Sequence, residues 1–126
     1  VIITPHEGEF KRIFKFRSED KISDCIRASK LIMNTVILKG SDTIIAAPNG
    51  RVWVNNNASN SLATAGSGDL LCGIISSLLA QRMSIVNASI ASVLIHSLLS
   101  EYKNCTTVED FLKKLPQIFR KLKNIN

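Results

Sequence analysis

The chain has 126 residues, enough for one domain with a single core, and its 45% apolar and 21% charged residues exclude a disordered protein. The net charge of +6 does not by itself indicate nucleic acid, because many cationic side chains fall in residues 103–123, where a solvated helix face explains them, and few aromatics are present to stack on bases. No apolar run approaches the roughly 18–20 residues that span a bilayer, so we expect a cytoplasmic protein with no nucleic-acid or membrane partner.

The first forty residues predict two strands with helices between them. Residues 1–4 form an apolar run ended by a proline, as in a buried strand that reaches a loop. A short helical piece over residues 9–13 follows. A second helix, capped by Ser23 and Asp24, is expected to run to Met33 and to end at Asn34, before the β-branched strand of residues 35–38.

Two groups of polar residues follow the ends of these strands. In open α/β sheets, ligands bind at the carboxyl ends of strands, and His6 comes directly after the first one. It could contact a ligand or make only a structural hydrogen bond. Lys39, which begins the segment Lys-Gly-Ser-Asp-Thr after the second strand, could lie against the phosphates or ribose of a nucleotide. It could equally be an exposed side chain in a simple hairpin turn.

The middle of the chain predicts a β-hairpin. Residues 43–47 and 51–54 are the two expected strands on either side of Pro48-Asn49-Gly50, a strong turn sequence. Trp53 is expected to pack in the protein rather than stack on a ligand. The polar residues 55–60 form a loop of the kind that places a binding site over a rigid sheet.

Three apolar helices are predicted in the second half. The first follows Asp69, and its small residues should lie close to the sheet; these are Cys72, Gly73, Ser76 and Ser77. The second covers residues 85–99, with His96 interpreted as a structural histidine. The third begins with a capping box over residues 106–109, and Pro116 should kink or restart it.

The three cysteines do not form a recognisable site. Cys25, Cys72 and Cys105 are too few and too scattered for a disulfide framework or a CxxC metal site. We interpret all three as small, buried apolar side chains in a reducing compartment. No metal-ligand set is evident in the sequence.

The most informative stretch is the glycine turn Gly66-Ser67-Gly68 and the carboxylate of Asp69 that follows it. Glycines let the backbone come close to a ligand, and a helix that begins there directs free N–H groups and its positive dipole end at the turn. This is an anion site. A lone Asp at a helix start can be only a cap. Beside a phosphate it can instead take a proton from an attacking hydroxyl.

These motifs resemble a known family. Residues 65–69, Ala-Gly-Ser-Gly-Asp, followed by Leu-Leu-Cys-Gly-Ile-Ile, resemble the signature of ribokinase-like enzymes. The longer stretch 62–69 narrows the resemblance to the ADP/ATP-dependent NAD(P)H-hydrate dehydratases. Residues 4–10 are similar to that family's Thr-Pro-His-Pro-Gly-Glu-Phe segment, with Glu7 in place of the usual proline, and Asn60 resembles the family's asparagine before the turn. Two motifs in the right order make the match specific.

The resemblance implies a fold, a reaction and its site. The fold would be an α/β three-layer sandwich of ribokinase-like type, truncated at the N-terminal side, with residues 1–126 forming the C-terminal part of one domain. The reaction would be the repair of hydrated NADH and NADPH, with ADP or ATP as phosphoryl donor and Mg²⁺ on the phosphates. The implied site residues are Asp69 as catalytic base, His6 and Asp69 for the substrate, Lys39, Gly40, Ser41, Asp42, Thr43 and Gly68 for the nucleotide, and Gly66, Ser67 and Gly68 as anion hole.

Two alternatives remain open at the level of sequence. A kinase of the same fold that acts on a sugar or a hydroxymethylpyrimidine would use the same glycine turn. A non-catalytic remnant is the other, because the resemblance covers only the C-terminal half of the catalytic domain. The chain begins with Val1, so we expect a fragment, a processed piece or one half of a split protein. A homo-oligomer or a separate N-terminal half is the expected protein partner.

Overall fold

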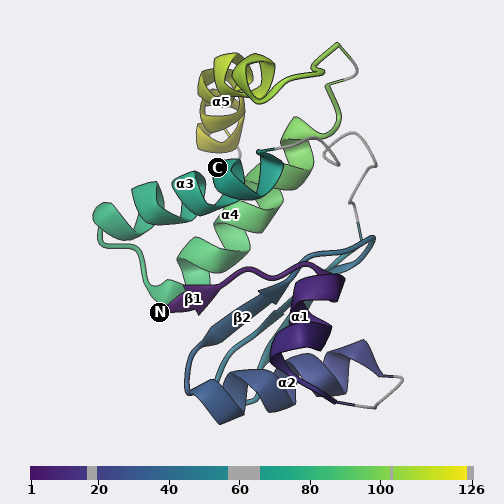
Figure 1. Cartoon of the computed structure of the whole chain (residues 1–126). Helices are drawn as coiled ribbons and strands as arrows, with labels where there is room; N and C mark the ends of the chain where they lie inside the picture. The colour runs from purple at the N-terminus through teal and green to yellow at the C-terminus, as the bar shows by residue number, and fades with distance from the viewer. Residues whose placement is uncertain (17–19, 57–65, 103, 125–126) are drawn as a thin grey trace.

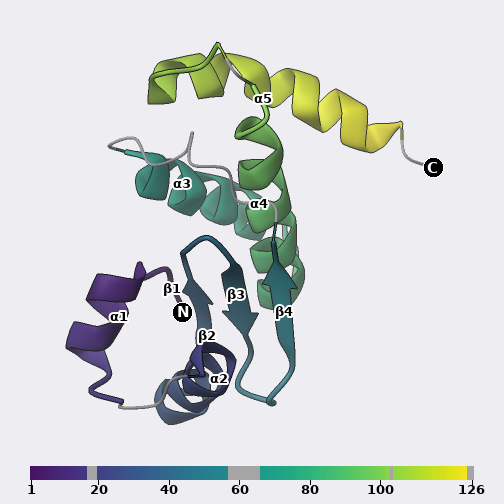
Figure 2. The ribbon, with the colours of Figure 1, turned by 90° about the vertical axis from the view of Figure 1, so that its right-hand side faces the viewer.

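The computed structural model describes residues 1–16, 20–56, 66–102 and 104–124, and it has three layers (Figure 1). A sheet forms the middle layer. Helices α1 and α2 cover one of its faces, α3 and α4 cover the other, and α5 packs outside α4 (Figure 2). This arrangement confirms the predicted α/β three-layer sandwich. Within the described residues, no helix is both long enough and apolar enough to cross a membrane.

The sheet has four strands in the order β1-β2-β3-β4, with bounds β1 (Ile2–Ile3), β2 (Thr35–Leu38), β3 (Thr43–Ala46) and β4 (Val52–Asn55). β1 pairs with β2 in parallel, and β2, β3 and β4 pair antiparallel in succession. Because β1 and β2 run in the same direction, their carboxyl ends meet at one edge of the sheet. The N–H of Lys39 donates to the carbonyl of Pro5 there, at 2.9 Å, and His6 and Lys39 form a parallel bridge.

Helices α1 (Glu7–Ile13) and α2 (Lys21–Ile32) bury one face of the sheet. The helices and the sheet pack together through one cluster of buried side chains, formed by Phe10, Phe14, Cys25, Ala28, Val36, Leu38, Ile44 and Ala46. Both helices start earlier than predicted. α1 begins at Glu7 because the side chain of His6 caps it. The predicted caps of α2 were wrong, because the carboxylate of Asp20 accepts from the N–H of Ile22 and from the hydroxyl of Ser23.

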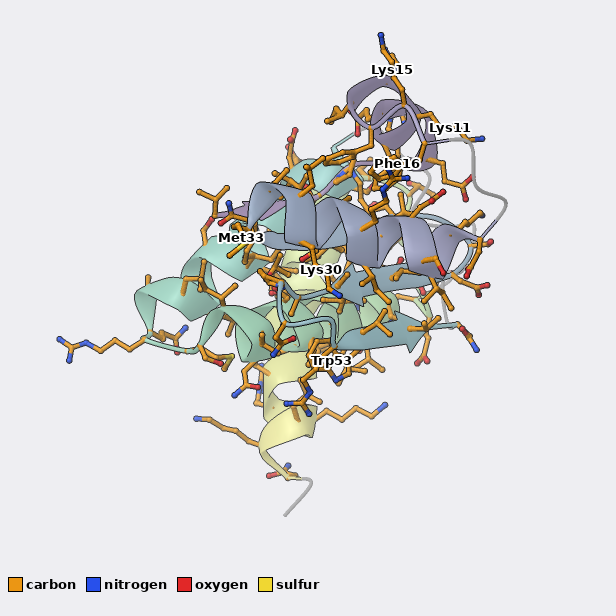
Figure 3. The ribbon with its side chains drawn as sticks, turned by 90° about the horizontal axis from the view of Figure 1, so that it is seen from below. Lys11, Lys15, Phe16, Lys30, Met33 and Trp53 are labelled. Atoms are coloured by element: carbon orange, nitrogen blue, oxygen red, sulfur yellow. The ribbon has the colours of Figure 1, made fainter. Side chains whose placement is uncertain are left out.

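Helices α3 (Ser67–Ala80) and α4 (Ile85–Leu99) bury the opposite face. The side chains that meet there are Ile37, Ile45, Leu71, Ile75 and Val93, with Trp53 packed against them as predicted. Figure 3 shows Trp53 on β4. The small residues of α3 were expected against the sheet, which was wrong. Large apolar residues occupy the buried side of α3, and the helical period therefore turns Cys72, Gly73, Ser76 and Ser77 outward.

Helix α5 (Val108–Lys123) packs against α4 through Phe111 and Ile118. Its capping box lies one residue later than predicted, since Thr107 and Asp110 form it. Pro116 lies inside the helix and does not restart it. Proline removes one helical hydrogen bond, and at this exposed position water can bond the carbonyl that is freed.

Candidate active site

The carboxyl edge of β1 and β2 opens into a cleft of about 530 Å³. The cleft lies between the β1–α1 connection and the first turn of α3. Its lining consists of Ile3, Thr4, Pro5, Glu9, Arg12, Ile13, Lys39, Gly68, Asp69 and Cys72. Three residues that the sequence marked for chemistry, Lys39, Gly68 and Asp69, therefore meet in one place although they come from two distant segments.

The glycine turn forms the start of α3 as predicted. Gly66 is the N-cap residue and has a φ of +88°, in the left-handed region that side chains other than glycine rarely adopt. A Cβ atom at this position would also lie 3.0 Å from Cγ2 of Val108. The first helical bond runs from the N–H of Leu70 to the carbonyl of Gly66. The N–H groups of Ser67, Gly68 and Asp69 thus have no partner within the helix.

Lys39 lies directly against this turn. A Cβ atom at Gly68 would be 2.9 Å from Nζ of Lys39, so the missing side chain at Gly68 is what makes room for the ammonium group. The amides at the start of α3 and one cation therefore converge on the same part of the cleft. Such a convergence suits a phosphate group.

Asp69 is the third residue of α3 and is exposed to the cleft. Among the described residues, it makes no hydrogen bond or ion pair. Its carboxylate is thus available to a ligand that enters the cleft. A group in this position can accept a proton from a hydroxyl held next to the phosphate.

His6 caps α1 rather than lining the cleft. Its Nδ1 accepts from the N–H of Glu9 at 3.2 Å, and the Glu9 carboxylate accepts from the N–H of His6 at 2.9 Å. This bond from the backbone, with a smaller contribution from nearby cations, lowers the pKa of Glu9 although burial opposes it. The structural hydrogen bond considered for His6 is therefore present. A contact between His6 and substrate stays a prediction.

The predicted nucleotide segment is a hairpin turn between β2 and β3, and only Lys39 from it lines the cleft. Ser41 and Asp42 are exposed and Thr43 is half-buried. A Cβ atom at Gly40 would lie 2.9 Å from Oε1 of Glu7, so this turn lies close to the start of α1. The predicted hairpin turn is therefore present, whereas Lys39 is half-buried in the cleft and not the exposed side chain of the simple-turn interpretation. Nucleotide binding by the turn stays a prediction.

His96 reaches the glycine turn from α4. Its Nε2 lies 3.0 Å from the carbonyl oxygen of Ser67, and because a carbonyl can only accept, Nε2 carries the proton. Burial lowers the pKa of His96, the bond to Ser67 opposes that shift, and the charge of Lys39 lowers the pKa further. The structural role predicted for His96 is confirmed, and the bond ties α4 to the first residue of α3.

Four lining residues with polar or ionisable side chains were missed at the level of sequence: Thr4, Glu9, Arg12 and Cys72. Cys72 was expected to be buried, which was wrong. It is exposed one turn after Asp69, with its sulfur 3.4 Å from the hydroxyl of Thr4. Cys25 and Cys105 are buried as predicted, and burial raises the pKa of the Cys25 thiol to about 11. Helical spacing places Cys72 on the face of Asp69 and Arg12 on the face of Glu9, but it does not show that these faces line a cleft.

Curated proteins similar to this chain carry related names. A family model described as NAD(P)H-hydrate dehydratase matches residues 1–120. The bifunctional NAD(P)H-hydrate repair enzyme Nnr of Gloeobacter violaceus is 38% identical over 102 residues, which cover 80% of this chain and 20% of that protein. The ADP-dependent (S)-NAD(P)H-hydrate dehydratase of Neisseria meningitidis is 37% identical over 100 residues, covering 76% of this chain and 34% of that protein.

Solved structures show the same similarity. ADP/ATP-dependent NAD(P)H-hydrate dehydratase from Bacillus subtilis, co-crystallised with ATP and Mg²⁺, matches with a TM-score of 0.86 and 25% identity over 95% of this chain. A ribokinase-like superfamily protein from Enterococcus faecalis matches with a TM-score of 0.80 and 28% identity. This chain covers 47% and 44% of those two chains. The ribokinase-like type of the fold is therefore confirmed, and the chain spans less than half the length of each of these proteins.

Proposed function

Because the chain belongs to the NAD(P)H-hydrate dehydratase family, we propose that it supplies the phosphoryl-transfer site of an enzyme that dehydrates hydrated NADH and NADPH. ADP or ATP is the phosphoryl donor in this proposal. One observation carries it: the uncapped start of α3, the ammonium group of Lys39 and the carboxylate of Asp69 converge on one cleft. These are the parts that phosphoryl transfer to a hydroxyl requires.

In the proposed reaction, Asp69 takes the proton from the hydroxyl that water has added to the nicotinamide ring. The hydroxyl oxygen then forms a bond to the terminal phosphorus of the nucleotide, while the bond from that phosphorus to its bridging oxygen breaks. The amides of Ser67 and Gly68, together with Lys39, stabilise the charge on the phosphoryl group in transfer. Phosphate next leaves the ring carbon, a neighbouring carbon loses a proton, and the double bond is restored.

The remaining predicted residues have supporting roles in the proposal. Residues 39–43 hold the donor nucleotide, with Gly68 allowing its phosphates to come close to the backbone, and Gly66 shapes the anion hole. His6 orients the hydrated nicotinamide. Among the described residues, no group of three or more His, Cys, Asp or Glu side chains is placed to hold a metal ion. In the proposal, Mg²⁺ binds the phosphates of the nucleotide, where it neutralises charge.

The proposal also includes a second protein component. The B. subtilis dehydratase chain is about twice as long as the matched region, and in this chain β1 has only two residues and stands at the edge of the sheet. We propose that the complete cleft uses the counterpart of the other half, supplied as a separate piece or within the same polypeptide, and that the active form is a homo-oligomer. A cytoplasmic location belongs to the same proposal, because a repair enzyme must meet the cofactors where they are used.

The test is to incubate the purified chain with hydrated NADH, ADP and Mg²⁺ and to follow the absorbance of reduced nicotinamide. Parallel reactions contain or omit a candidate N-terminal half. Recovery of absorbance in either reaction is the expected result. Phosphorylation of a sugar or a hydroxymethylpyrimidine instead would identify a kinase. Absence of both turnover and nucleotide binding, with the second half present, would identify a remnant.

A further inference from the structure

The cleft contains a second cation that the proposed phosphoryl transfer does not use. Arg12 lines the cleft from α1, whereas Lys39 enters it at the carboxyl end of β2. Lys39 lies at the start of α3, where the transferring phosphate is proposed to bind. Arg12 belongs to a different segment of the lining, which runs from β1 into α1 and also contains Glu9. We call this segment the β1–α1 wall of the cleft.

The surroundings of Arg12 leave its charge available. Its Nε donates to the carbonyl of Gly8 at 3.2 Å, which fixes the root of the guanidinium group and leaves the two terminal nitrogens as donors. Of the carboxylates in the described residues, none lies within 4.0 Å of this group. Arg12 does help to lower the pKa of Glu9, after the larger contribution from the backbone of His6. The cation is thus held in place without being neutralised by a direct ion pair.

The neighbouring cation on the same helix shows that this placement is specific. Lys11 does not line the cleft and instead borders a separate hollow with Phe10, Phe14 and Phe16. Figure 3 shows Lys11 extending outward from α1. One step along a helix turns a side chain by about 100°, so Arg12 and Lys11 face different surroundings although they differ by a single position.

We propose that Arg12 is a substrate-binding residue that holds the pyrophosphate of the dinucleotide substrate. This inference rests on the proposed function. Hydrated NADH and NADPH carry a pyrophosphate between their two ribosides, and the nicotinamide hydroxyl must lie at Asp69. The rest of the dinucleotide substrate then passes along the β1–α1 wall of the cleft, because the other wall holds the donor nucleotide. The planar fork of a guanidinium group matches two phosphate oxygens, which the rounded ammonium group of a lysine does not.

The test compares Arg12→Gln with Lys11→Gln, two variants that lose the same charge from adjacent positions. With hydrated NADH, Arg12→Gln should raise KM by about 10- to 100-fold at nearly unchanged kcat, the loss expected for a charge-assisted contact. With the phosphate-free hydrate of reduced nicotinamide riboside, kcat/KM should be the same for Arg12→Gln and the unsubstituted chain. KM for ADP should not change in either variant, and Lys11→Gln should behave as the unsubstituted chain throughout.

Several results would overturn the assignment. An equal fall of kcat/KM on both substrates would mean that Arg12 only supports the structure, and a raised KM for ADP would place Arg12 with the donor. Equilibrium binding of NADH, which has the same pyrophosphate and needs no turnover, should be weaker for Arg12→Gln by a similar factor. Equal NADH binding by this variant and the unsubstituted chain would contradict the role of Arg12 alone. If the unsubstituted chain bound no dinucleotide even with the candidate N-terminal half present, the proposed function itself would fail.

Discussion

Helices α1, α3 and α5 each have a carboxylate at their third residue, and the three carboxylates are used differently. In α1, Glu9 accepts from the N–H of His6 at 2.9 Å. In α5, Asp110 accepts from the N–H of Thr107 at 3.1 Å. In α3, Asp69 makes no bond with any described residue and lies in the cleft. Two of the carboxylates therefore stabilise their own helix, whereas the third is available to a ligand.

The difference originates at the residue before each helix. His6 and Thr107 have side chains that accept from backbone N–H groups, so they complete a capping box with the carboxylate. Gly66 has no side chain, and within the described residues no side chain caps the amides of the first turn of α3. A helix start with glycine in place of a capping side chain loses only a few tenths of a kcal/mol of stability. The comparison teaches that the start of α3 lacks a capping side chain at little cost in stability, which supports the proposed anion site there.

The largest effect should come from removing the available carboxylate. Asp69→Asn keeps the size of the side chain but cannot accept the proton, so kcat should fall by about 10²- to 10⁴-fold while the Kd for ADP stays nearly constant. Glu109→Gln is the matched control, because Glu109 is also an exposed first-turn carboxylate, in α5. Steady-state kinetics and ADP titration measure both quantities. Normal turnover by Asp69→Asn would show that Asp69 is not the base.

A smaller effect should follow from filling the turn. The added methyl group of Gly68→Ala would lie 2.9 Å from Nζ of Lys39 and displace it, so nucleotide affinity should fall by about 10-fold or more. Gly73→Ala is the control in the same helix, where a Cβ atom meets nothing within 4 Å. That variant should gain roughly 0.5–1 kcal/mol of helix stability and bind nucleotide normally. Equal nucleotide affinities of the two variants would contradict the proposed contact.

Sequence periodicity was sufficient for most of the fold. Residues 35–38 and 85–99 match β2 and α4 because their apolar content leaves no competing assignment. The helix starts were harder to predict, since several side chains near each start can serve as caps. Asp20 rather than Ser23 caps α2, and the choice depends on where the preceding chain enters the helix.

The candidate site was predictable in part. The glycine turn and Asp69 were found because local residue order determines their geometry. Arg12 was missed because it comes into the cleft only when β1 and β2 pair in parallel and α1 packs beside them. Cys72 was misplaced because small side chains do not define a buried face. Long-range placement of this kind is not contained in a local pattern.

Removing the cap of a capped helix should lower stability without affecting nucleotide binding, the opposite of what we expect at the turn of α3. Ser84 caps α4 by accepting from the N–H of Asn87 at 3.2 Å. Ser84→Ala should lower the free energy of unfolding by about 1 kcal/mol and leave the Kd for ADP unchanged. Urea denaturation and ADP titration give the two values. If Ser84→Ala weakened nucleotide binding as Gly68→Ala should, the distinction between structural and ligand-binding helix starts would be lost.

The smallest effect should appear in the pH dependence of stability. The pKa of His96 is lower in the folded protein, mainly because of burial, so the unfolded chain binds more protons. Stability should therefore be full above the ordinary histidine pKa of about 6.5 and decline as pH falls below it, with a slope of at most about 1.4 kcal/mol per pH unit. The carboxylates with lowered pKa, such as Glu9, act only below about pH 4.5.

His96→Gln keeps an N–H donor for the carbonyl of Ser67 but has no proton to gain in this range. Its free energy of unfolding, measured in urea between pH 5 and pH 8, should depend less on pH than that of the unsubstituted chain. Identical pH dependence of the two proteins would show that His96 does not cause the decline.

The backbone amides at the start of α3 give the most direct test of the account. In a titration of the ¹⁵N-labelled chain with ADP and Mg²⁺, the NMR signals of Ser67, Gly68 and Asp69 should shift strongly, while those at the capped starts of α4 and α5 should stay in place. Unchanged signals from the α3 amides at saturating ADP, or shifts of equal size at the capped helices, would contradict it.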